Sequence, residues 1–124
     1  MHLPLALLFY EDILPGTQLV NRLQDLGYRV QVVADAVALP VVAASAGAMF
    51  LLADLVSKRA DICAQVRSLR ANPATAHLPI IAFADDAETQ LQAAGKAAGA
   101  TLVVSDAAIV AHLHPLIEQA LQVE

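Results

Sequence analysis

The chain has 124 residues, 58% of them apolar, which is enough to bury the core of one domain without disulfides or a structural metal, so we expect a single domain over residues 1–124. Its net charge is −5 and its seven lysines and arginines are scattered, so no basic stripe indicates direct nucleic-acid binding. The single cysteine, Cys63, has no intramolecular disulfide partner, which favours a reducing compartment and predicts a cytoplasmic location.

Short apolar runs alternate with helix-patterned stretches along the chain. The run Leu5–Phe9 predicts a buried strand. It has no basic leader and continues into Glu11 and Asp12, so it indicates neither a signal peptide nor a membrane span. A helix is predicted over Pro15–Leu26, with Gly27 as its stop. The apolar face of this helix comprises Leu19, Leu23 and Leu26.

The second βα unit has a strand over Arg29–Ala34 and a weak helix that Asp35 caps and that extends through Ala44. Pro40 and the neighbouring valines weaken this helix. The third strand, Met49–Ala53, ends on Asp54.

Asp61 is the expected cap of a third helix that ends near Asn72 and Pro73. A fourth strand over Pro79–Phe83 follows. Asp85 or Asp86 then caps a fourth helix that closes at Gly99. The buried face of the third helix is expected to comprise Ile62, Val66 and Leu69.

The fifth strand, Leu102–Val104, ends at Ser105 and Asp106, and a last helix reaches Val123. Pro115 removes one helix hydrogen bond, so it should kink this helix or mark a late start. The inward stripe is expected to be Ile109, Leu113, Leu116, Ile117 and Ala120.

Five such units predict an α/β domain with a parallel sheet, in which the functional crevice lies beyond the carboxyl ends of the strands. Glu11, Asp12 and Asp54 stand at those ends, on the first and third strands. Three neighbouring carboxylates either raise a pKa or recruit a hard cation such as Mg²⁺. The alternative is that each is only a solvated residue at the end of a strand.

With these residues in place, the sequence resembles the response-regulator receiver family of two-component signalling over essentially its whole length. The resemblance lies in residues 7–12, residues 50–55, residues 65–73 with 77–83, and residues 97–100. It implies the flavodoxin-like (βα)5 fold, a three-layer sandwich with a parallel sheet in strand order 2-1-3-4-5.

The resemblance also implies site residues. Asp54 matches the phosphoacceptor, Asp12 and Asp54 match direct ligands of a weakly bound Mg²⁺, Glu11 would act through water, and the carbonyl of Val56 would complete the ligands. A cation there screens the negative charges of the carboxylate and the phosphate donor.

The residues that transmit phosphorylation depart from the family. Ala84 stands where the family has a serine or threonine, and Ser105 or Asp106 takes the place of its lysine. The aromatic reporter position falls at Val103 or Val104. Lys58 could reach a phosphate, although a solvated loop lysine is the simpler interpretation. The pattern therefore predicts an atypical or pseudo-receiver.

Three functions remain open. The favoured one is a pseudo-receiver that docks to a protein partner, such as a sensor histidine kinase or a fused output domain, with possible homodimerisation through helix four, strand five and helix five. The second is a working phosphoreceiver with an altered switch. The third, a small enzyme on the same fold, lacks a catalytic triad order and a cofactor loop.

His112 and His114 are two residues apart and face different sides of a helix, so they predict no metal site. Cys63 is expected to be a buried apolar residue.

Overall fold

The computed structural model describes residues 3–11, 13–58 and 60–122 and contains a five-stranded parallel sheet in the order β2-β1-β3-β4-β5. The strands are β1 (Leu5–Phe9), β2 (Arg29–Val32), β3 (Phe50–Asp54), β4 (Ile80–Phe83) and β5 (Leu102–Val104). The helices are α1 (Ile13–Asp25), the 3₁₀ turn η1 (Ala36–Ala38), α2 (Leu39–Ala46), α3 (Ile62–Ala71), α4 (Thr89–Ala98), α5 (Asp106–Ala111) and α6 (Leu113–Gln122). The predicted fold class and strand order are confirmed.

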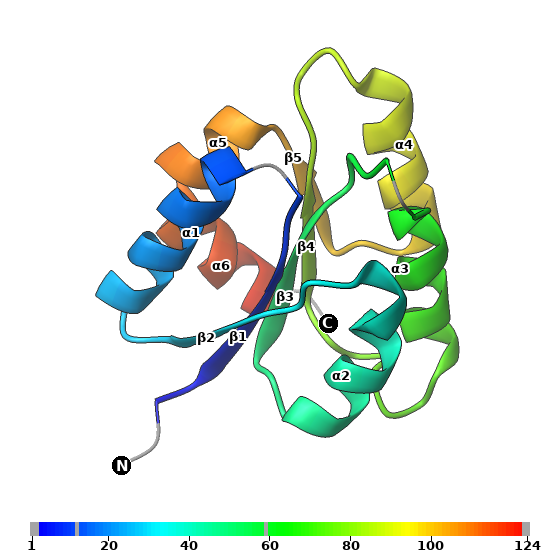
Figure 1. Ribbon diagram of the computed structural model, residues 1–124, viewed down its shortest axis with the longest axis horizontal. Coiled ribbons are helices and arrows are strands. Elements are labelled where there is room, and N and C mark those ends of the chain that lie inside the picture. Colours follow the sequence, from blue (N-terminus) through cyan, green and yellow to red (C-terminus); the bar gives the residue numbers. More distant parts are fainter. Residues whose placement is uncertain (1–2, 12, 59, 123–124) are drawn as a thin grey trace.

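The helices cover both faces of the sheet and make a three-layer sandwich (Figure 1). Helices α1, α5 and α6 lie on one face, and α2, α3 and α4 lie on the other. Each layer encloses its own apolar cluster against the sheet. No helix in the described part of the chain is long and apolar enough to cross a membrane.

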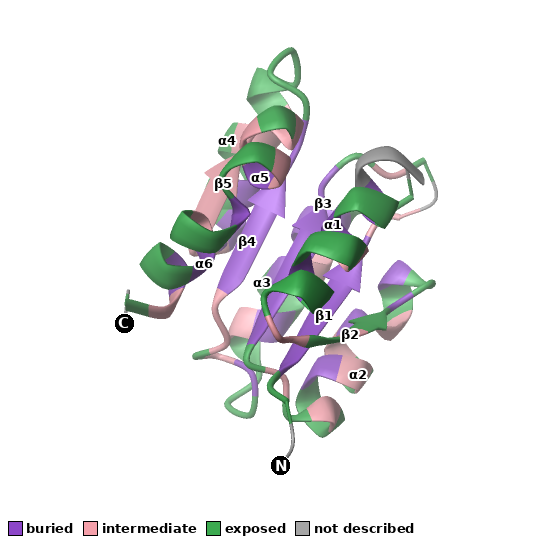
Figure 2. Cartoon of the chain, turned by 90° about the vertical axis from the view of Figure 1, so that its left-hand side faces the viewer, coloured by how far each residue is buried: buried purple, intermediate pink, exposed green. Residues whose placement is uncertain are grey.

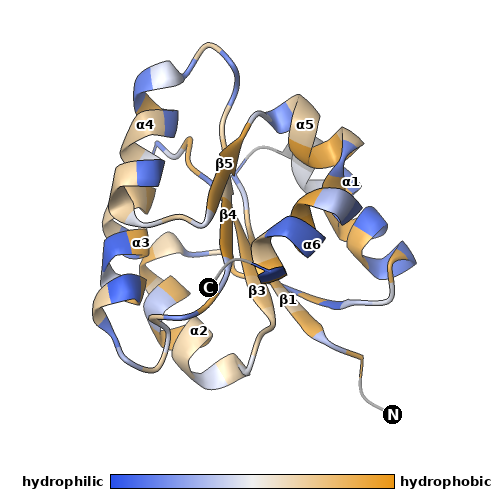
Figure 3. Ribbon diagram, turned by 180° about the vertical axis from the view of Figure 1, so that it is seen from behind, coloured by the Kyte–Doolittle hydropathy of each residue, from blue (hydrophilic) through white to orange (hydrophobic). Residues whose placement is uncertain are grey.

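The sheet is apolar because its three central strands are buried from both sides. Every residue of β1, β3 and β4 is buried, and Figure 2 shows these strands in purple between exposed helix surfaces. Alternate residues enter opposite clusters, so that Leu7 packs toward α2, α3 and α4 while Leu8 packs toward α1, α5 and α6. Continuous apolar strands are what a parallel sheet covered on both faces requires. The same strands form the orange centre of Figure 3.

Several predicted caps and stops are confirmed. Asp61 caps α3 by accepting a hydrogen bond from the Ala64 N–H (3.1 Å). Asp35 accepts from the Val37 N–H (3.1 Å) but caps only the 3₁₀ turn η1, and α2 itself begins at Leu39 without a side-chain cap. Gly99 ends α4 with φ +117°, a left-handed conformation that glycine adopts without strain. Cys63 is buried, as expected, and this burial raises the pKa of its thiol.

Several boundaries differ from the prediction, two of them with consequences for side chains. Helix α1 ends at Asp25, so Leu26 lies beyond the helix and is 39% exposed instead of buried. Helix α4 begins only at Thr89, because the Asp85 side chain closes a turn by accepting from the Ala87 N–H (2.9 Å). Neither Asp85 nor Asp86 is therefore the helix cap.

The last predicted helix is two helices that meet at His112, whose backbone (φ −126°, ψ 34°) leaves the helical region. Pro115 falls in the first turn of α6, where its missing N–H has no intrahelical acceptor to lose. The late start was the correct alternative. The expected stripe is buried except for Leu116, which is half-buried, and the end predicted at Val123 lies outside the described residues.

Candidate functional site

The carboxyl ends of the strands frame a pocket of about 440 Å³. Strand ends meet at one edge of a parallel sheet, so residues that are far apart in sequence come together there. The lining consists of Glu11, Asp54, Val56, Lys58, Asp85, Glu88 and Asp106. Five carboxylates and one lysine thus share one pocket.

Asp54 is the most buried acidic residue of this pocket, with 4% of its surface exposed. It is the last residue of β3, a central strand, and it pairs with Phe83 of β4. One carboxylate oxygen accepts a hydrogen bond from the Val56 N–H (2.9 Å), which fixes the side chain at the start of the following loop. The Asp54 carboxyl group is therefore held in place at the end of β3, within the pocket.

Glu11 connects the end of β1 to the loop after β3. Its carboxylate accepts hydrogen bonds from the Ser57 hydroxyl (2.5 Å) and from the Lys58 N–H (3.0 Å). These bonds hold the loop that follows Asp54 against the neighbouring strand end. The structure therefore brings Glu11, Asp54 and Val56 together, as the sequence predicted, and Asp12 lies outside the described residues.

Three further acidic residues complete the pocket, and the sequence interpretation did not assign them to it. Asp85 and Glu88 come from the segment between β4 and α4, and Asp106 begins α5. Asp85 and Asp106 each follow within two residues of a strand end, so the rule that selected Glu11 and Asp54 could also have selected them. We had interpreted Asp85 only as a helix cap.

The positions where the family has its switch residues are occupied differently. Ala84 is fully buried and has no hydroxyl. The Ser105 hydroxyl accepts a hydrogen bond from the Ala108 N–H (3.0 Å) and caps α5, while Asp106 lines the pocket. The Gln92 side-chain amide donates to the carbonyls of Ala84 (3.0 Å) and Asp85 (3.3 Å). The loop after β4 is thus tied to α4 by this chain's own contacts.

Metal-binding potential depends on the oxygen donors of this pocket. Within residues 3–11, 13–58 and 60–122, no three His, Cys, Asp or Glu side chains form a group that could hold a metal ion.

Lys58 is exposed at the pocket rim, as expected. His112 and His114 are both exposed, and His114 Nε2 lies 2.9 Å from a Glu118 carboxylate oxygen.

Comparisons with known proteins identify the architecture. The sequence matches no protein-family model and no curated protein. The receiver domain of sensor histidine kinase PA1611 from Pseudomonas aeruginosa PAO1, crystallised with a magnesium ion in its active-site cleft, is similar in structure, with a TM-score of 0.86 and 23% identity over 99% of this chain and 100% of that one. The receiver domain of NtrX from Brucella abortus has a TM-score of 0.83 and 15% identity over 96% of this chain and 99% of that one.

A third similar structure is the signal receiver domain of an HD domain-containing protein from Pseudomonas fluorescens Pf-5, with a TM-score of 0.83 and 18% identity over 98% of this chain and 89% of that one. All three superpose on nearly the whole of this chain, including its five-stranded sheet and the helices on both faces. The chain therefore has the fold of the receiver domains found in response regulators and sensor kinases.

Proposed function

We propose that residues 1–124 form an atypical receiver domain of a two-component signalling protein, with Asp54 as the candidate phosphoacceptor. The observation that carries the proposal is the position of Asp54, which is 4% exposed and ends a central strand inside an acidic pocket. The domain acts by docking to a protein partner and is not an enzyme. A similar receiver domain with magnesium in its cleft supports a role for this pocket.

A weakly bound Mg²⁺ prefers carboxylate and carbonyl oxygens and keeps several waters, so it needs few protein ligands. The described residues alone form no metal-binding group of three side chains, and the proposed ligand set therefore includes Asp12. Asp54 and the carbonyl of Val56 would contact the ion directly, together with Asp12. Glu11 already accepts two hydrogen bonds from the loop after β3, which favours contact through a bound water. A Mg²⁺ ion bound here would screen the negative charges of the carboxylate and the phosphate donor.

The chemistry open to Asp54 is attack of a carboxylate oxygen on phosphorus. The new oxygen–phosphorus bond forms while the donor's bond to phosphorus breaks, and the donor leaves with the electron pair. Asp85, Glu88 and Asp106 make the pocket strongly negative, and no lysine follows β5 to offset the added phosphoryl charge. Phosphorylation is therefore possible but poorly stabilised.

The conformational response to phosphorylation should be small. A phosphoryl group shifts the equilibrium between two conformations of the domain only if it interacts more favourably with one of them than with the other. Ala84 offers no hydroxyl to a phosphoryl oxygen, and neither Ser105 nor Asp106 supplies the cation that the family has after β5. The Gln92 amide ties the loop after β4 to α4 without any contact to a phosphoryl group, by donating to the carbonyls of Ala84 and Asp85. These features favour a pseudo-receiver over a working phosphoreceiver.

The partners follow from this proposal. A sensor histidine kinase or a fused output domain is the expected protein partner, and the expected location is the cytoplasm. Any homodimer is proposed to use the face of α4, β5 and α5, where small side chains such as Ala94 are cheap to desolvate.

The test records amide NMR spectra of the wild type with Mg²⁺, then with beryllofluoride, beside Asp54→Asn as the control. We expect weak, saturable Mg²⁺ shifts near Asp54 and small beryllofluoride shifts that stay within the pocket. The control should show neither beryllofluoride shift nor normal Mg²⁺ affinity. Large shifts that reach α4 and β5 in the wild type alone would establish the working phosphoreceiver instead.

A further inference from the structure

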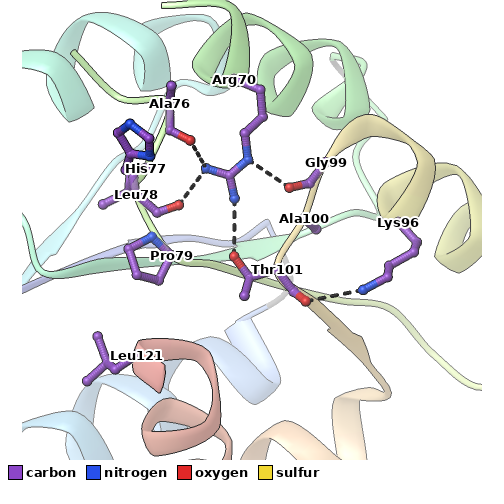
Figure 4. Close-up of a pocket in the computed structure, with 10 residues that line it drawn as sticks. All are labelled: Arg70, Ala76, His77, Leu78, Pro79, Lys96, Gly99, Ala100, Thr101 and Leu121. Atoms are coloured by element: carbon purple, nitrogen blue, oxygen red, sulfur yellow. Dashed lines mark hydrogen bonds between the residues drawn. The ribbon is translucent and has the colours of Figure 1, made fainter. Parts of the chain in front are cut away.

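A second cavity lies at the opposite edge of the sheet, at the amino-terminal ends of β4 and β5. It measures about 770 Å³, within the range of small-molecule sites. Its lining comprises Arg70, Ala76, His77, Leu78, Pro79, Lys96, Gly99, Ala100, Thr101 and Leu121 (Figure 4). No acidic side chain of the described residues lines it, in contrast to the pocket around Asp54.

Two cationic side chains of this cavity, Arg70 and Lys96, donate hydrogen bonds to the same residue, Thr101. Arg70 donates from Nη2 to the Thr101 hydroxyl (3.1 Å), and the Lys96 ammonium donates to the Thr101 carbonyl (3.3 Å). Figure 4 shows both side chains directed at Thr101 from α3 and α4. Among the described residues, these two cations donate only to neutral oxygens, namely backbone carbonyls and the Thr101 hydroxyl.

Both cations retain donors after these bonds. Arg70 has five N–H groups and uses four, on the carbonyls of Gly99, Ala76 and Leu78 and on the Thr101 hydroxyl. Lys96 has three and uses one. One Nη2 hydrogen and two ammonium hydrogens therefore remain around Thr101, and three donors match the oxygen atoms of a phosphate group.

A simpler interpretation is that Arg70 and Lys96 only neutralise the carboxyl ends of α3 and α4, whose last turns contain them. Each helix end carries about −0.5 charge, so two ends offset about one of the two positive charges. About one positive charge remains before His77 is considered. Burial also lowers the pKa of Arg70, which indicates that its charge is incompletely solvated.

We propose that this cavity binds a small phosphate-bearing molecule, with the phosphate held by Lys96 and Arg70 beside Thr101. The chain has a net charge of −5, and the five carboxylates at the other edge of the sheet repel anions. An anion is therefore directed to this end of the molecule. The proposal does not depend on phosphorylation of Asp54.

The test is an amide NMR titration of the whole chain with inorganic pyrophosphate, at constant ionic strength and without divalent cations. The wild type should show saturable shifts at Leu78, Gly99, Ala100 and Thr101. Lys96→Gln should raise the apparent Kd about tenfold, as expected for loss of one charge-assisted hydrogen bond. The chain has only one other lysine, Lys58, and Lys58→Gln removes the same charge at the opposite edge and should leave the Kd within about twofold.

Both lysines are exposed, so neither substitution threatens folding. Three outcomes would overturn the proposal. The first is the absence of saturable shifts at this cavity. The second is equal weakening by both substitutions, which would indicate a general charge effect. The third is loss of binding in Lys58→Gln alone, which would place the anion at the acidic pocket.

Discussion

Arg70→Met should destabilise the fold far more than its position in a ten-residue surface helix suggests. The substitution keeps an unbranched apolar side chain in place of the arginine stem and removes the guanidinium. That group donates to the carbonyls of Gly99 (2.8 Å), Ala76 (3.1 Å) and Leu78 (2.6 Å) and to the Thr101 hydroxyl (3.1 Å). One side chain thus joins α3 to the loops that precede β4 and β5.

The magnitude follows from these four bonds. A hydrogen bond contributes about 1 kcal/mol net, because water replaces the lost partner, so the four sum to about 4 kcal/mol. The cavity is open, and water can reach the freed carbonyls. Removing a partly desolvated charge returns about 1 kcal/mol. We therefore expect a loss of about 3 kcal/mol in the free energy of unfolding.

The assay is equilibrium urea unfolding followed by far-ultraviolet circular dichroism. Arg67→Met is the matched control, since Arg67 lies one turn earlier on the same helix and, within the described part of the chain, its side chain makes only an exposed ion pair with Asp61 at 3.7 Å. That control should lose less than about 0.5 kcal/mol. Arg70→Lys should resemble Arg70→Met more than the wild type, because an ammonium cannot reproduce the planar set of donors. Equal losses in Arg67→Met and Arg70→Met would refute the reasoning.

Three further predictions concern other parts of the fold. Asp61→Ala should lose about 1 kcal/mol of stability by removing the cap bond to Ala64, whereas Asp61→Asn should stay within about 0.5 kcal/mol of the wild type, and urea unfolding of both variants measures this. The Cys63 pKa is raised by burial and then by nearby Asp61, so folding favours the neutral thiol; the stabilisation is complete below the unfolded pKa and is lost as the pH rises through the folded one. Wild type should therefore lose more stability than Cys63→Ala between about pH 8 and pH 10, and parallel losses would contradict this. If the chain self-associates, Ala94→Glu on α4 should weaken the dimer in analytical ultracentrifugation and Val41→Glu on α2, where the valine is 72% exposed, should not; the reverse result would move the interface to α2.

The acidic pocket shows how much of a site local reasoning can find. The sequence predicts Glu11 and Asp54 because each stands at the end of an apolar strand, and the strand order brings those strand ends together. The sequence pattern marks Asp106 only as a replacement for the family's lysine and predicts no role for Glu88. Asp106 stands within two residues of the end of β5, so the same rule could have found it. The place of Glu88 depends on how the segment after β4 turns, which neighbouring residues alone do not fix.

Strand positions, caps and glycine stops were determined by the sequence itself, because they depend on short-range physics. An unbroken apolar run such as Leu5–Phe9 must be buried, Asp61 can cap only the helix that follows it, and Gly99 takes a left-handed conformation that other residues resist. These features need no knowledge of distant contacts.

Only the tertiary structure decided the features that depend on packing between distant segments. The break at His112 places α5 and α6 separately against the sheet, and Gln92 reaches back to the carbonyl of Ala84. Arg70 is the clearest case, since its four acceptors lie 6 to 31 residues away along the chain. In the sequence Arg70 is one more cation in an amphipathic helix, and only the packing of α3 beside the loops before β4 and β5 makes it the centre of a cationic cavity.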